Sequence, residues 1–108
     1  MQVRIWISFD LGVKGDYPDL YAWLDNHDAV ECGDSFASLF IECTGRDTVE
    51  KELLAELESS VNLASTDRIY VIYRREDGLA KGTFLHGKRK ANPWAGYGTH
   101  DDEESDSE

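Results

Sequence analysis

Asp10 is the residue of this chain best placed to do chemistry. It ends a segment, Val3 to Asp10, in which apolar and polar residues alternate, and this alternation predicts a half-buried strand. A carboxylate at the end of a first strand is held by rigid backbone and can still be reached from solvent. The sequence leaves a structural alternative open, in which Asp10 only starts the next loop by accepting a backbone hydrogen bond.

A second candidate site is basic. Residues 68–100 hold seven basic and two acidic residues, whereas residues 1–67 hold four basic and 14 acidic residues. Positive charge mixed with aromatic rings is typical of surfaces that bind single-stranded nucleic acid. The alternative is a solvated basic arm that pairs with acidic residues of the same chain. The predicted nucleic-acid-binding residues are Arg74, Arg75, Lys88, Arg89, Lys90 and Trp94.

Composition restricts the class of protein. The chain has 108 residues, 41% of them hydrophobic, which fits one domain with a small core. No apolar run approaches the ~20 residues that span a bilayer, and the N-terminus does not have the pattern of a signal peptide, so we expect a cytoplasmic protein with no membrane partner. The net charge of −11 disfavours general attraction to nucleic acid and fits a basic protein partner.

Periodicity and turn residues predict two helices and five strands. Asp16 is expected to cap the first helix, Gly33-Asp34 to form a hairpin turn, and Asp47 with Glu50 to form a capping box at the second helix. Asp77-Gly78 predicts a further turn. The expected elements are a strand at 2–9, a helix at 17–27, strands at 29–32 and 36–43, a helix at 48–61, a strand at 68–75 and a short strand at 81–86.

This order predicts an α+β fold, a ferredoxin-like βαββαβ sandwich with two helices on one face of a four-stranded antiparallel sheet, plus a short C-terminal strand and arm. We expect the domain at residues 1–87, a basic and aromatic arm at 88–100 and a disordered acidic tail at 101–108. The residues expected under the helices are Val3, Ile5, Ile7, Phe9, Ala37, Leu39 and Ile41.

The opposite face of the sheet is unusually aromatic. It is expected to present Trp6, Phe36 and Phe40 to solvent beside Arg4, Ser8 and Asp10. The sequence leaves two alternatives for what covers this face. A second copy of the chain would make a homodimer, or the C-terminal arm would fold back and place Trp94 and Tyr97 there.

Three short segments carry a resemblance to known families. They are the strand end Ser8-Phe9-Asp10-Leu11, the pair Ser35-Phe36, and the segment from Asp67 to Tyr73, DRIYVIY. They resemble the small ferredoxin-like CRISPR-associated adaptation nuclease and the virulence-associated protein D toxins of toxin–antitoxin systems. The resemblance covers roughly residues 1–75. It implies a homodimer that binds or cleaves RNA or DNA, in some members with Mg²⁺.

Under this resemblance Asp10 is the expected catalytic residue and metal ligand of a magnesium-dependent endonuclease. Mg²⁺ takes oxygen ligands, neutralises phosphate charge and activates water. A two-fold axis between two chains would bring two Asp10 carboxylates together, and Ser8 or Ser35 would orient water or phosphate. The alternative function is a non-catalytic, acidic interaction or inhibitor module of a phage or mobile element, because the outer face of the second helix is strongly acidic.

Overall fold

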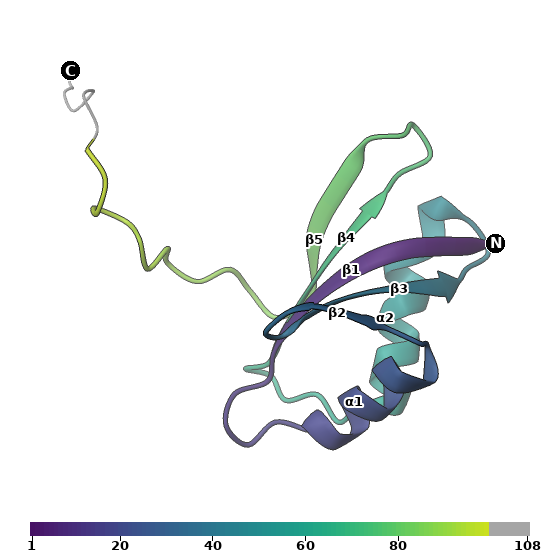
Figure 1. Cartoon of the computed structure of the whole chain (residues 1–108), viewed down its shortest axis with the longest axis horizontal. Helices are drawn as coiled ribbons and strands as arrows, with labels where there is room; N and C mark the ends of the chain where they lie inside the picture. Colours follow the sequence, from purple (N-terminus) through teal and green to yellow (C-terminus); the bar gives the residue numbers. More distant parts are fainter. Residues whose placement is uncertain (100–108) are drawn as a thin grey trace.

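The chain folds into five strands and two helices (Figure 1). The computed structural model describes residues 1–99, so the predicted tail at 101–108 lies outside the described residues. Every predicted element is present, with ends that agree to within one residue. The elements are β1 (Gln2–Asp10), α1 (Tyr17–Asn26), β2 (Val30–Gly33), β3 (Phe36–Glu42), the 3-10 helix η1 (Arg46–Thr48), α2 (Val49–Ser60), β4 (Arg68–Arg74) and β5 (Ala80–His86).

All strands belong to one antiparallel sheet in the order β2-β3-β1-β4-β5. The central strand is β1, whose Ile5 is paired with Leu39 of β3 on one side and with Tyr73 of β4 on the other. The short final strand is a full member of the sheet, because β5 pairs with β4 from Ala80 to His86. The α+β class with an antiparallel sheet and two helices is therefore confirmed.

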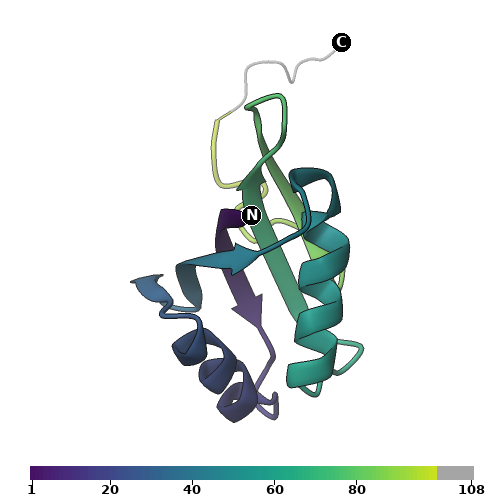
Figure 2. The same ribbon diagram turned by 90° about the vertical axis from the view of Figure 1, so that its right-hand side faces the viewer.

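The core lies between one face of this sheet and the two helices. Both helices lie on the same side of the sheet (Figures 1 and 2), and the indole of Trp23 in α1 donates a hydrogen bond of 3.1 Å to Glu56 in α2. The predicted inward-facing residues of β1 and β3 are all buried. They are Val3, Ile5, Ile7, Phe9, Ala37, Leu39 and Ile41, and the helices add Leu20, Trp23, Leu24, Val49, Leu53 and Leu57.

The predicted hairpin turn is wrong by one residue. Gly33 pairs with Phe36, so the turn residues are Asp34 and Ser35, and not Gly33 and Asp34. Ser35 takes the left-handed conformation, with φ +60°. A register shift between Glu31 and Gly33 accommodates the displaced turn, and such bulges cannot be recognised from alternation alone.

The predicted capping box at α2 is also wrong. A 3-10 turn precedes the helix, and the Gly45 N–H donates to Thr48 Oγ1 at 3.3 Å. Glu50 does not reach back to a cap, because its carboxylate accepts hydrogen bonds from the Tyr73 hydroxyl at 2.6 Å and from Lys81 at 2.7 Å. The side chain therefore joins α2 to β4 and β5.

The arm leaves the other face of the sheet uncovered. Residues 91–99 extend away from the domain (Figure 1), and Trp94 and Tyr97 are 68% and 88% exposed. The alternative in which these two rings lie on the open face is therefore wrong for the described residues. None of the described helices is long and apolar enough to cross a membrane.

Candidate nucleic-acid interface

Four strands place aromatic and basic side chains on the uncovered face of the sheet, which we call the open face. Residues that pair across antiparallel strands point to the same side, so the register decides its membership. Arg4 of β1 pairs with Phe40, and Tyr70 of β4 pairs with both Ser8 and Phe84. The open face consists of Gln2, Arg4, Trp6, Ser8, Asp10, Val30, Phe36, Ser38, Phe40, Glu42, Arg68, Tyr70, Ile72, Arg74, Ala80, Gly82 and Phe84.

One cluster on the open face surrounds Arg4. Its guanidinium carbon lies 4.5 Å from the centre of the Phe40 ring and 5.9 Å from that of Trp6. The Arg4 Nη1 donates to the Ser38 hydroxyl at 2.9 Å, which fixes the orientation of the guanidinium. The Phe40 side of this cluster is accessible, since Phe40 is 46% exposed.

A second cluster lies where the arm begins. Arg89 places its guanidinium 5.4 Å from the Phe84 ring and 6.0 Å from the Tyr70 ring. The two rings meet edge to face, with centres 4.9 Å apart. Gly82 makes room for this arrangement, because a Cβ atom there would lie 2.4 Å from the Tyr70 hydroxyl oxygen. The glycine therefore lets the Tyr70 side chain lie flat over β5.

A shallow cavity of about 370 Å³ opens beside the second cluster. Its Asp10 carboxylate accepts the Gly12 N–H at 3.2 Å and an Arg68 N–H at 3.4 Å. The Gly12 hydrogen bond lowers the pKa of Asp10 most, and Arg68 and the charge of Lys90 lower the pKa further. The Arg68 Nε is buried and has no hydrogen-bond acceptor among the described residues. The lining residues are Ser8, Asp10, Arg68, Tyr70, Phe84 and Arg89.

The cavity brings together part of the predicted catalytic set. Ser8 and Asp10 both line it, but Ser35 lies at the β2–β3 turn and lines a different cavity. The backbone carbonyl of Ser35 accepts the Phe9 N–H at 3.0 Å, so this residue serves the hairpin. The Asp10 contact with Gly12 is the backbone hydrogen bond of the structural alternative considered from the sequence.

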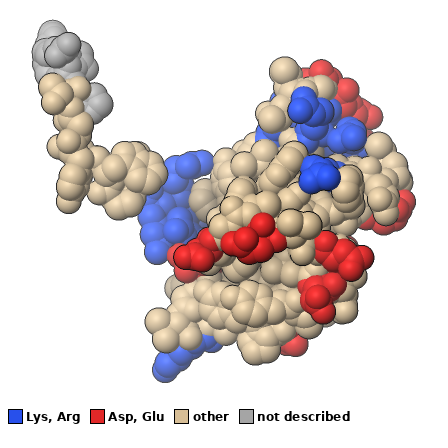
Figure 3. All heavy atoms as spheres, in the orientation of Figure 1, with Lys and Arg blue, Asp and Glu red and all other residues tan. Residues whose placement is uncertain are grey.

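The predicted basic residues do not gather at one place. Arg89 lines the cavity. Lys90 lies close enough for its charge to lower the pKa of Asp10. Arg74 is on the open face but at its far end, where it donates to the Gly78 carbonyl. Arg75 is paired with Asp77 in the β4–β5 turn at 2.5 Å. Figure 3 shows basic side chains where the arm leaves β5 and a separate basic group toward the β4–β5 hairpin.

The remaining predicted residues, Lys88 and Trp94, are exposed on the arm. From the sequence, Arg4 was placed on the open face without a binding role, and Tyr70 and Phe84 were missed. Tyr70 was read only as a strand former. The Asp77-Gly78 turn could have revealed its role, because this turn sets the pairing of β4 with β5 and so places Tyr70 and Phe84 side by side.

Comparison with protein-family models, curated proteins and solved structures found no significant match. The resemblance to the adaptation nuclease and the virulence-associated protein D toxins therefore stays a prediction.

One chain does not supply a complete set of ligands for Mg²⁺ at this site. Among the described residues, Asp10 is the only carboxylate that lines the cavity, and Arg68 already lies against it. Among residues 1–99, no group of three His, Cys, Asp or Glu side chains is arranged to hold a metal ion. A metal at Asp10 would need further oxygen ligands from a second chain or from the bound phosphate.

Proposed function

We propose that this protein binds single-stranded nucleic acid across the open face. The observation that carries the proposal is the cluster of Arg89, Tyr70 and Phe84 beside the cavity that Arg68 lines. Bases stack on aromatic rings and guanidinium planes at about 1–3 kcal/mol per base, and arginines bind the phosphates between them. A single strand offers both groups at once, whereas a duplex hides its base faces.

The two clusters lie at separate positions along the open face and suggest two contact points for one strand. The Arg89 cluster lies at the end of β1 that carries Asp10, and the Arg4 cluster lies toward its beginning. Ile72, an uncharged residue of the open face, pairs with Trp6 of the first cluster and precedes the second cluster along the sheet. A strand that follows this path would avoid the acidic outer face of α2, because the helices cover the opposite side of the sheet.

The strand order supports a ferredoxin-like classification, in which β1 lies between β3 and β4 and both helices lie on one face. Folds of this kind present strand-borne aromatics to RNA bases from an open sheet, as in the RNA-recognition motif. This analogy concerns the arrangement of the rings and assigns no sequence relationship.

The test is fluorescence anisotropy with labelled oligouridine and oligothymidine at several salt concentrations. We expect salt-sensitive binding, with a slope of about −0.7 in log affinity per phosphate contact. Arg89→Gln should weaken binding several-fold and reduce the slope, and Phe84→Leu should weaken it with little change in slope. Lys51→Gln is the matched control, because Lys51 is exposed on α2 and its loss removes the same charge. If Arg89→Gln and Phe84→Leu bind the oligonucleotides as tightly as the wild type, the proposal is overturned.

Cleavage of the bound strand is a second proposal, favoured by the position of Ser8 and Asp10 in the same cavity as Arg68 and Arg89. It requires a homodimer that joins two Asp10 carboxylates around Mg²⁺. The same labelled strands incubated with Mg²⁺ or Mn²⁺ test it. Products that appear with wild type and disappear with Asp10→Asn would support it, and intact strands in both would leave binding as the function.

A further inference from the structure

The end of β3 has unpaired backbone groups. Hydrogen-bonded and non-hydrogen-bonded residue pairs alternate along antiparallel strands. The Cys43 N–H donates to the Met1 carbonyl at 2.8 Å and the Phe9 N–H to the Ser35 carbonyl at 3.0 Å, so these pairs mark the hydrogen-bonded positions. The bonded residues of β3 are therefore the odd-numbered ones. Phe40 and Glu42 direct their N–H and C=O groups away from β1.

The neighbouring strand β2 is too short to satisfy these groups. Its pairing with β3 ends where Val30 meets Ser38. Before Val30, Asp28 takes the left-handed conformation with φ +54° and turns the chain from α1 into β2. Within residues 1–99, the outward N–H and C=O groups of Phe40 and Glu42 consequently have no hydrogen-bond partner.

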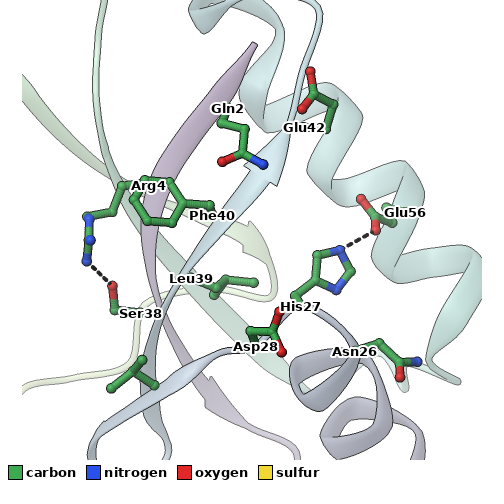
Figure 4. Close-up of a pocket in the computed structure, with 11 residues that line it drawn as sticks. Gln2, Arg4, Asn26, His27, Asp28, Ser38, Leu39, Phe40, Glu42 and Glu56 are labelled. Atoms are coloured by element: carbon green, nitrogen blue, oxygen red, sulfur yellow. Dashed lines mark hydrogen bonds and ion pairs between the residues drawn. The ribbon is translucent and has the colours of Figure 1, made fainter.

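A groove of about 480 Å³ runs along this unpaired edge (Figure 4). Phe40, Arg4 and Glu42 border it on the open-face side, and residues at the end of α1 border it on the helix side. His27 Nε2 lies 2.9 Å from the Glu56 carboxylate, which also accepts the Trp23 indole N–H. This contact holds the helix-side wall in place.

The groove is predominantly acidic. Asp28, Glu42 and Glu56 line it, and the cations described beside them are Arg4 and the N-terminal ammonium, which lies 2.7 Å from the Glu42 carboxylate. The Arg4 guanidinium already donates to the Ser38 hydroxyl and lies over the Phe40 ring. The three carboxylates therefore outnumber these two cations, and an incoming segment with positive side chains would meet net negative charge.

We propose that an extended, basic segment of a partner protein binds this groove as an added strand beside Phe40 and Glu42. Strand addition satisfies exposed backbone groups at a sheet edge, and pockets for alternate side chains give it specificity. The residue opposite Phe40 faces the open face and is best apolar. The next residue points between the sheet and the helices, toward Glu56 and Asp28, and is best Lys or Arg. The residue opposite Glu42 is also best Lys or Arg.

The occupant is another protein rather than a second copy of this chain. The basic residues 88–90 of this chain begin at β5, the opposite edge of the sheet, where Arg89 is held against Tyr70 and Phe84. Two copies joined through β3 would bring their Glu42 carboxylates close together, and like charges across a strand pair are destabilising.

The probe is a synthetic peptide with Val-Lys-Lys at its centre, added to ¹⁵N-labelled full-length protein. We expect the largest amide shifts at Phe40 and Glu42, and slower hydrogen exchange of these two amides in the complex. A peptide with glutamate in place of lysine should bind about tenfold more weakly or not at all. The lysine peptide N-methylated at every central residue keeps its charge but cannot join a sheet, so it should lose binding as well.

Two variants at one position separate backbone pairing from charge. Glu42→Pro removes the outward N–H without removing a hydrogen bond to β1, because the bonds to β1 come from odd-numbered residues of β3. It should bind the lysine peptide several-fold more weakly than Glu42→Gln, which loses the same charge and keeps the N–H. Circular dichroism verifies that both variants fold. Equal binding of the methylated peptide, or shifts centred elsewhere, would overturn the proposal, as would dimerisation through this edge in the absence of peptide.

Discussion

Asp10 and Arg68 face each other on β1 and β4, with the Asp10 Oδ2 atom 3.4 Å from an Arg68 guanidinium nitrogen. The carboxylate that the sequence marked for catalysis is thus partly neutralised by a basic residue of the next strand. The Gly12 N–H and Arg68 together hold the pKa of Asp10 below the usual range of an aspartate. The pair lies at the mouth of the cavity in which we propose that a nucleotide binds.

This pair predicts the outcome of the Asp10→Asn substitution. If Asp10 only restrains Arg68, neutralising it frees a guanidinium for phosphate, and affinity for single-stranded oligouridine should rise about two- to fivefold at low salt. Anisotropy titrations measure this. The control is Asp77→Asn, which removes an acid in the β4–β5 turn and should change affinity less. Weaker binding of Asp10→Asn with Mg²⁺, but not without it, would instead assign Asp10 to a metal.

Gly82 offers a way to alter the open face without altering the core. A Cβ atom at position 82 would meet the Tyr70 hydroxyl, so Gly82→Ala should push the ring away from its contact with Phe84. We expect binding of single strands to fall several-fold and thermal stability to stay within about 1 kcal/mol, since replacing glycine in a strand also restricts the unfolded chain. Ring proton shifts of Tyr70 would report the movement. Displaced rings with unchanged affinity would show that Tyr70 is not part of the binding surface.

The alternation in β1 was sufficient to predict which face is buried. Because side chains in a strand alternate strictly, Val3 to Phe9 on one side and Arg4 to Asp10 on the other follow from the sequence once the strand is recognised. The order of elements followed from turn residues, above all Asp77-Gly78. These are local signals, and the structure confirms the elements that rest on them.

The features that alternation did not predict depend on a single backbone angle or on contacts between distant residues. The left-handed conformations of Asp28 and Ser35 set where β2 begins and where its hairpin turns, and neither residue is a glycine that would reveal it. Glu50 was assigned to a cap because its partners, Tyr73 and Lys81, lie far along the chain. The basic residues were assigned to one surface because they lie close together in the sequence, whereas in the structure Arg75 pairs with Asp77 and Arg74 donates to the Gly78 carbonyl in the β4–β5 turn.

Tyr73 predicts a loss of stability in alkaline solution. Burial, and then the hydrogen bond to Glu50, raise the pKa of Tyr73 to about 12. Since an unfolded tyrosine titrates near pH 10, the neutral form favours folding by on the order of 2 kcal/mol; this contribution is complete below about pH 10 and is lost between about pH 10 and 12. Urea unfolding across this range measures the loss. Tyr73→Phe is the control and should lose less stability there. If the wild type and Tyr73→Phe lose the same stability between about pH 10 and 12, Tyr73 is not the source of the loss.

The register of β3 predicts an alternating pattern of amide hydrogen exchange. Leu39 and Ile41 donate to β1, whereas the amides of Phe40 and Glu42 point out of the sheet at its edge. In the free protein at low concentration, the two inward amides should exchange at least about a hundredfold more slowly than the two outward ones. Ser38 serves as an internal control, because it faces β2 and should be intermediate. Exchange followed by ¹⁵N–¹H spectra over a range of concentrations would decide this. Slow exchange at all four positions that persists on dilution would mean that the chain covers its own edge, and the groove would not be open to a partner strand.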